Sequence, residues 1–122
     1  MTLRIQAVDE REQVWTIALR GRIDQPASRA IEDAVDELCA AGHLRLVVDM
    51  SQVVYLASAG LGSLLTGVRR ARLLKGDVRL AGLNDRVREV FEMSGFDQVF
   101  SIFPTIAEAA ASYHVDGAAR SP

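Results

Sequence analysis

From about residue 26 onward, segments with the spacing of an amphipathic helix alternate with short apolar segments, and this alternation constrains the fold most strongly. One helix face consists of five apolar residues at the spacing i, i+3, i+4, i+7 and i+8: Ile31, Ala34, Val35, Leu38 and Cys39. Gly42 suits the left-handed residue that ends a helix, and Leu44 to Val48 follow as a buried strand that ends at Asp49. Helices and strands that alternate in this way pack as layers through right-handed crossover connections.

The same alternation continues toward the carboxyl end. The turn around Ser58 is followed by a second helix whose apolar face consists of Leu61, Leu64, Leu65, Val68 and Ala71. A third helix is predicted to begin at Asn84 or Asp85 and to end at Gly95. A last helix begins at the capping box that Thr105 and Glu108 form, and it is predicted to end at Tyr113.

Strands are predicted at both ends of this pattern. Apolar and polar residues alternate near the start of the chain, and the charged residues 9–12 separate two such segments, which indicates an antiparallel pair. Short apolar segments at 78–81 and 99–103 supply further strands. We therefore predict an α/β fold with a mixed sheet of about four to five strands and helices packed against it. Residues 1–113 are expected to form one domain, and the small polar residues 114–122 a flexible tail.

Composition excludes several functional classes. The formal net charge of −2 provides no overall field that attracts nucleic acid, and the single Cys39 excludes an intrachain disulfide or a multi-thiolate metal site. Met50 to Val68 carries no charge, but three glycines and several polar residues interrupt it, so we predict no membrane insertion. No signal peptide is recognisable at the start of the sequence, and a cytoplasmic protein without cofactor or metal is expected.

The turn from Ala57 to Gly62 is the most informative segment of the sequence. Ser58 lies where extended chain becomes helix, so its hydroxyl is expected to accept a hydrogen bond from the amide of Gly60 or Leu61 as a helix N-cap. Gly60 and Gly62 leave the first turn without side chains, which allows close approach of a backbone or a phosphate. The same residues are also explained by a serine that serves only as a helix cap and by glycines that serve only to allow tight packing.

Four stretches of the sequence resemble the STAS family, the anti-sigma factor antagonists of bacterial partner-switching systems. They are Gly21-Arg22-Ile23-Asp24, then Leu46 to Ser51 leading to Ala57-Ser58-Ala59-Gly60-Leu61-Gly62, then Lys75-Gly76, and finally Glu92 to Phe96. The second stretch is similar to the family's phosphorylation turn Asp-Ser-Ser-Gly-Leu-Gly. The likeness extends from about Leu3 to Tyr113, and the four stretches follow one another in the family's order.

The resemblance implies a regulatory protein and not an enzyme. In the family the serine of this turn is phosphorylated by a serine kinase that is also the anti-sigma factor, and the unmodified protein binds that kinase. Ser58 is then the phosphoacceptor, with partner contacts expected at Asp24 and at Ala57, Ser58, Ala59, Gly60, Leu61 and Gly62. A serine phosphatase is a further expected partner. The family's usual acidic residue before the serine is Ala57 here, which bears on kinase recognition and on the rate of dephosphorylation.

Three other functions are weighed against this one. A STAS-like subunit of a membrane transporter or lipid-transport complex would use the same turn as a constitutive docking surface, without phosphorylation. A hydrolase would need Ser58, His43 and Asp49 in one site, but the sequence lacks the Gly-x-Ser-x-Gly elbow, because Leu56 stands two residues before the serine. Asp49 at a strand end also suits a receiver phosphoacceptor, but the acidic pair and the lysine that a receiver requires are absent from the sequence.

Overall fold

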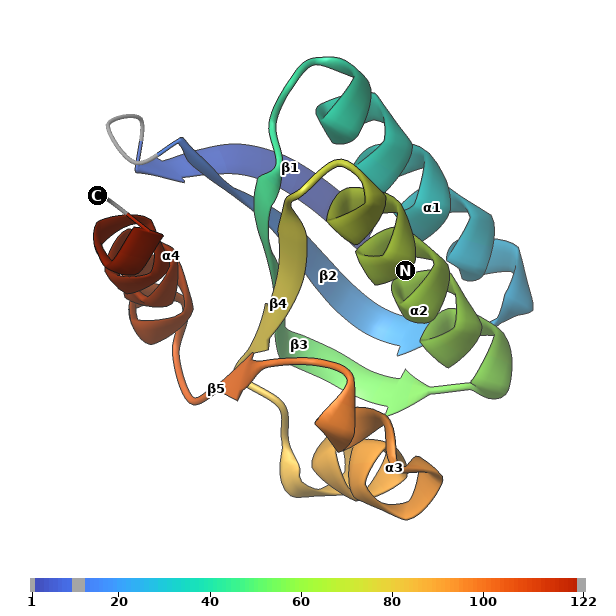
Figure 1. Cartoon of the computed structure of the whole chain (residues 1–122). Helices are drawn as coiled ribbons and strands as arrows, with labels where there is room; N and C mark the ends of the chain where they lie inside the picture. Colours follow the sequence, from blue (N-terminus) through green and yellow to red (C-terminus); the bar gives the residue numbers. More distant parts are fainter. Residues whose placement is uncertain (1, 10–12, 121–122) are drawn as a thin grey trace.

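The computed structural model describes residues 2–9 and 13–120 and shows one mixed sheet with helices on both faces (Figure 1). In chain order the elements are β1 (Thr2–Asp9), β2 (Val14–Ile23), α1 (Gln25–Ala40), β3 (Arg45–Leu56), α2 (Ser58–Leu73), β4 (Asp77–Ala81), α3 (Asp85–Ser94), the short 3-10 helix η1 (Phe96–Gln98), β5 (Ile102–Phe103) and α4 (Ile106–Arg120). The predicted α/β fold is confirmed.

The strands lie in the order β1-β2-β3-β4-β5. The first pair is antiparallel, as predicted, and every other pair is parallel. Helices α1 and α2 lie side by side on one face of the sheet, and α4 lies on the opposite face (Figure 1). The parallel strands bring the carboxyl ends of β2 and β3 to the same edge, and this edge positions the candidate site.

Local signals in the sequence predicted the helices well. The five buried residues of α1 are Ile31, Ala34, Val35, Leu38 and Cys39, which are the residues that the helical spacing indicated. Asn84 caps α3 through its side chain, which accepts a hydrogen bond from the Val87 amide at 2.9 Å. Gly95 ends the same helix in the left-handed conformation, with φ of 78°. Thr105 accepts a hydrogen bond from the Glu108 amide at 3.1 Å, so the predicted cap of α4 is also present.

Three predicted boundaries are wrong. Strand β3 does not end at Asp49 but continues to Leu56, since β2 pairs with it along this whole length. The predicted strand at 99–103 forms only over Ile102–Phe103, since the chain before it turns through η1. Helix α4 continues to Arg120, past the predicted end at Tyr113, so the backbone of the expected flexible tail is helical as far as residue 120. The division into a domain and a tail stays a prediction.

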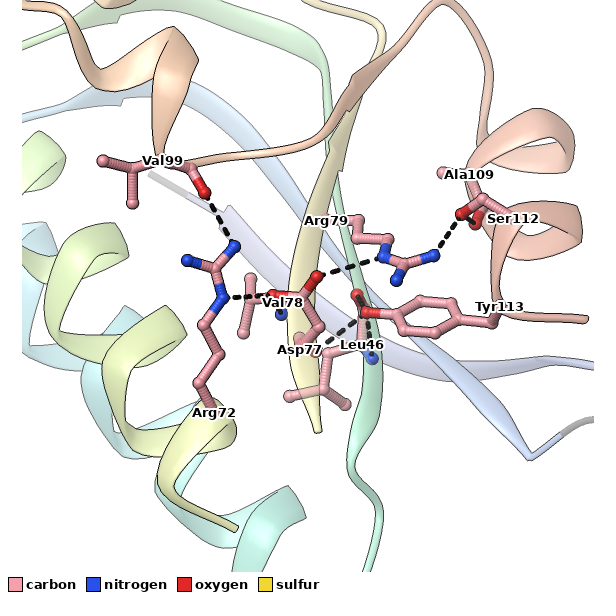
Figure 2. A network of polar contacts seen from close by, with 9 residues as sticks. All are labelled: Leu46, Arg72, Asp77, Val78, Arg79, Val99, Ala109, Ser112 and Tyr113. Atoms are coloured by element: carbon pink, nitrogen blue, oxygen red, sulfur yellow. Dashed lines mark hydrogen bonds and ion pairs between the residues drawn. The ribbon is translucent and has the colours of Figure 1, made fainter. Parts of the chain in front are cut away.

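A polar network holds α4 against the first residues of β3 and β4 (Figure 2). The Tyr113 hydroxyl lies 2.6 Å from the Leu46 carbonyl oxygen and 2.8 Å from that of Asp77, and it accepts a hydrogen bond from the Leu46 amide at 3.1 Å. The Asp77 carboxylate pairs with Arg72 of α2 at 2.9 Å and with Arg79 at 3.1 Å. Arg79 also donates a hydrogen bond to the Ser112 hydroxyl of α4 at 2.6 Å, so the Asp77 carboxylate links α2 on one face to α4 on the other through Arg79. Within the described part of the chain, no helix is long and apolar enough to cross a membrane.

Cys39 lies in the core between α1 and the sheet, with 6% of its surface exposed. Burial raises the pKa of its thiol, an effect that Asp36 adds to and Arg70 opposes. Because the thiolate is the reactive form, we expect the native thiol to react with Ellman's reagent at pH 8 at least about tenfold more slowly than the same thiol in denaturant. Equal rates in the two conditions would contradict the buried position.

Candidate functional site

The candidate site lies at the edge of the sheet where β2 and β3 end. Ile23 pairs with Leu56, and the Ala57 amide donates a hydrogen bond to the Ile23 carbonyl at 2.9 Å. The chain then turns into α1 after Asp24 and into α2 after Ala57, so Asp24 and the Ser58 turn lie on the same rim. The Asp24 carboxylate accepts a hydrogen bond from the Ala27 amide at 3.4 Å, so it caps α1 while remaining exposed.

The predicted role of Ser58 as the helix cap is wrong. Ala57 is the N-cap, with extended backbone angles (φ −81°, ψ 165°), and its carbonyl accepts the first helical hydrogen bond, from the Leu61 amide at 3.1 Å. Ser58 is the first helical residue, because the pairing of β3 with β2 holds the chain extended through residue 57. Its side chain is exposed, and no side chain of the described residues caps α2. The Ser58 hydroxyl is therefore presented to solvent and not used by the fold.

The two glycines of the turn have different roles. Gly60 is buried, and a Cβ at this position would lie 2.6 Å from Ile23 Cγ2 and 2.8 Å from Leu56 Cδ1. Gly62 is exposed, and a Cβ there would meet no atom within 4 Å. Leu61 is also buried, at 8% exposure, and packs in the core. Of the predicted contact residues, Gly60 and Leu61 thus position the turn, while the outer surface consists of Asp24, Ser58 and Gly62 with half-buried Ala57 and Ala59.

The electrostatics of the turn favour a negative group at Ser58. The amides of the first turn of a helix have no intrahelical acceptor, and the helix dipole places partial positive charge there. The first turn of α2 contains no acidic residue, whereas its last turn contains Arg70 and Arg72. A phosphoryl group on the Ser58 oxygen would stand beside these amides, a position that favours an anion.

Ala57→Asp is expected to stabilise the protein by about 0.5–2 kcal/mol, since aspartate is among the best N-cap residues and alanine among the poorest. The carboxylate would accept a hydrogen bond from an amide of the first turn and would also interact favourably with the helix dipole. Urea unfolding followed by the fluorescence of Trp15, the single tryptophan, measures the change. A loss of stability would show that residue 57 is constrained by packing and not by capping.

The rival sites do not assemble. His43 precedes the first residue of β3 and stacks on Trp15, with ring centroids 4.4 Å apart, whereas Ser58 follows the last residue of that strand. The two residues therefore lie beyond opposite ends of a 12-residue strand. Asp49 lies within β3, where its carboxylate accepts a hydrogen bond from the Ser51 amide at 3.0 Å. Neither a hydrolase triad nor a receiver site is formed, and the described residues contain no group of metal-binding side chains.

Sequence reasoning missed a pair of exposed side chains beside the turn. The Arg22 guanidinium lies over the ring of Tyr55, 4.5 Å from its centroid, and Val54 and Tyr55 are 58% and 44% exposed. Arginine and tyrosine are frequent energetic centres of protein interfaces. The pair was missed because residues after Asp49 were not assigned to a strand. The succession of β-branched and aromatic residues Val53, Val54 and Tyr55, which favours a strand, was the signal that could have revealed it.

Comparison with known proteins agrees with this architecture. The sequence matches the STAS domain family over residues 6–109. The anti-sigma-F factor antagonist RsfB of Mycobacterium tuberculosis is 30% identical over 103 residues, which cover 84% of this chain and 83% of RsfB. An anti-sigma factor antagonist from Mycobacterium paratuberculosis has the same fold, with a TM-score of 0.82 at 24% identity over 93% of both chains. The phosphorylated form of SpoIIAA, a cell fate determinant of Bacillus, superimposes with a TM-score of 0.72 at 20% identity over 91% of this chain and 98% of SpoIIAA. Because the match covers most of this chain, the chain belongs to the STAS domain family.

Proposed function

We propose that this protein is an anti-sigma factor antagonist that binds a serine kinase, itself the anti-sigma factor, and is released when that kinase phosphorylates Ser58. The observation that carries the proposal is the exposed Ser58 side chain at the first position of α2, on a rim that it shares with Asp24. Relatives named as antagonists of anti-sigma factors support the partner class. The protein acts by reversible binding in the cytoplasm and performs no chemistry of its own.

The switch works because phosphorylation affects the interface far more than the fold. Phosphoserine adds nearly two negative charges and three strong acceptor oxygens at one point. At the amino end of α2 the helix favours an anion by up to ~1–2 kcal/mol, so the domain stays folded. Burying the same charge unpaired against a partner surface costs several kcal/mol. Because 1.4 kcal/mol changes affinity tenfold, roughly 4 kcal/mol separates the two forms by a factor of a thousand.

Ala57 affects the stability of the phosphate on Ser58. A carboxylate at this position would repel a neighbouring phosphate and compete for the amides of the first turn. With alanine there, the phosphate faces the helix end without a neighbouring acidic residue in the first turn. This arrangement stabilises the phosphorylated form. Because phosphate monoesters hydrolyse extremely slowly without catalysis, removal of the phosphate requires a serine phosphatase.

Incubation with the cognate kinase and ATP is expected to raise the intact mass by one phosphate, and peptide mapping is expected to place it on Ser58. Ser58→Ala should show no increase in mass, whereas Thr66→Ala, which removes an exposed hydroxyl of the same helix, should be modified like the wild type. Modification of Thr66 or Thr105 with Ser58 untouched would overturn the proposal. The transporter-subunit alternative predicts no phosphorylated form, and the named relatives do not favour it.

A further inference from the structure

No described helix covers part of the sheet face on which α4 lies. Helix α4 contacts β3, β4 and β5, whereas α1 and α2 lie on the opposite face (Figure 1). On the uncovered part, over β1, β2 and the middle of β3, lies a hollow of about 200 Å³. Seven residues line it: Thr2, Arg4, Ala18, Leu19, Arg20, Asp49 and Gln52.

The strand register explains both the hollow and its charges. Ala18 of β2 is paired with Arg4 on one side and with Asp49 on the other, so one methyl group forms the floor between two long or charged side chains. Adjacent strands lie about 4.8 Å apart, which separates the backbones of Arg4 and Asp49 by roughly 10 Å. Arg20 is paired with Thr2 and Gln52, in the neighbouring row. Arg4 and Asp49 therefore stand on opposite sides of the Ala18 floor, whereas Arg20 stands on the middle strand, diagonal to both of them.

The arginines of the hollow have no acidic partner among the residues that the structure describes. Arg4 and Arg20 are exposed, and no ion pair involves either of them among residues 2–9 and 13–120. Asp49 is half-buried, and the hydrogen bond from the Ser51 amide holds its carboxylate in place. Arg4 and Asp49 across a small floor, with Arg20 next to it, offer one position that suits a carboxylate and another that suits an ammonium group.

We propose that this hollow binds a small zwitterion of the α-amino-acid type. Its carboxylate would lie between Arg4 and Arg20, where guanidinium groups donate paired hydrogen bonds. Its ammonium group would lie against Asp49, and the Gln52 amide would supply a neutral hydrogen-bonding group beside it. A dicarboxylate fits the arginines equally well but places its second charge near Asp49. This site is independent of Ser58, so the proposal extends beyond the antagonist function.

A matched pair of ligands tests the proposal, because L-aspartate is succinate with one added ammonium group. Titration of each ligand into the isotopically labelled full chain, followed by backbone amide chemical shifts, reports binding at Ala18, Arg20 and Gln52. We expect saturable shifts at these amides with both ligands and at least about threefold tighter binding of aspartate. Net charge alone would favour succinate, so this order of affinities depends on Asp49.

Variants separate the two subsites. Arg4→Gln/Arg20→Gln should weaken both ligands at least about tenfold, and Asp49→Asn should remove the preference for aspartate while keeping an acceptor for the Ser51 amide. Lys75→Gln, which removes an exposed charge at the far end of α2, should change neither affinity. Saturable binding that survives the double arginine substitution, or no saturable binding of either ligand, would overturn the proposal. Equal affinity for aspartate and succinate would overturn the ammonium subsite.

Discussion

Ser58→Asp is expected to weaken binding of the kinase by at least about a hundredfold while the protein keeps its fold and its stability. Aspartate carries one of the nearly two charges of phosphoserine, and it places that charge at the first residue of α2. There the helix dipole favours a carboxylate by about 0.3–1 kcal/mol, so thermal unfolding should occur at an unchanged or slightly higher temperature. Calorimetric titration with the kinase in ADP, which prevents phosphoryl transfer, measures the affinity.

Ser58→Ala is the matched control, and its expected behaviour follows from the observed cap. Because Ala57 and not Ser58 is the N-cap of α2, removal of the hydroxyl sacrifices no capping hydrogen bond. Alanine also has the best helix propensity, so stability should stay within about 0.5 kcal/mol of the wild type. Affinity for the kinase should stay within about tenfold. If the aspartate variant binds as tightly as the alanine variant, Ser58 does not control the interface.

Gly60→Ala is expected to destabilise the protein by about 1–3 kcal/mol, although alanine is the better helix former. The added methyl group would lie 2.6 Å from Ile23 Cγ2 and 3.3 Å from the Ile23 carbonyl oxygen. Ile23 is fully buried, and its branched side chain has few alternative rotamers, so α2 must move away from the end of β2. This movement would also displace the Ser58 turn, and we therefore expect weaker kinase binding as well.

Gly62→Ala provides the comparison within the same helical turn. A methyl group at residue 62 meets no atom within 4 Å, so only the gain in helix propensity applies. We expect stabilisation by about 0.5–1 kcal/mol in urea unfolding. The two glycine variants should thus change stability in opposite directions. A similar effect of both substitutions would contradict the close packing of Gly60 against Ile23.

The sequence was sufficient for features that depend on residues near one another in the chain. The buried face of α1, the Asn84 cap and the left-handed Gly95 follow from helical periodicity and from the backbone preferences of single residues. The α/β class follows from the alternation of such segments. The motif around Ser58 also indicated which turn to consider, because its residue types and spacing are local properties.

Only the tertiary structure decided the features that depend on contacts between distant segments. Pairing with β2 extends β3 to Leu56, and this extension moves the cap of α2 from Ser58 to Ala57. Packing against Ile23 distinguishes Gly60 from Gly62, which look alike in the sequence. The register of three strands places Ala18 between Arg4 and Asp49 and so creates the hollow. Register and close packing are set by side chains far apart in the chain, and the periodicity of one segment carries no information about its partners.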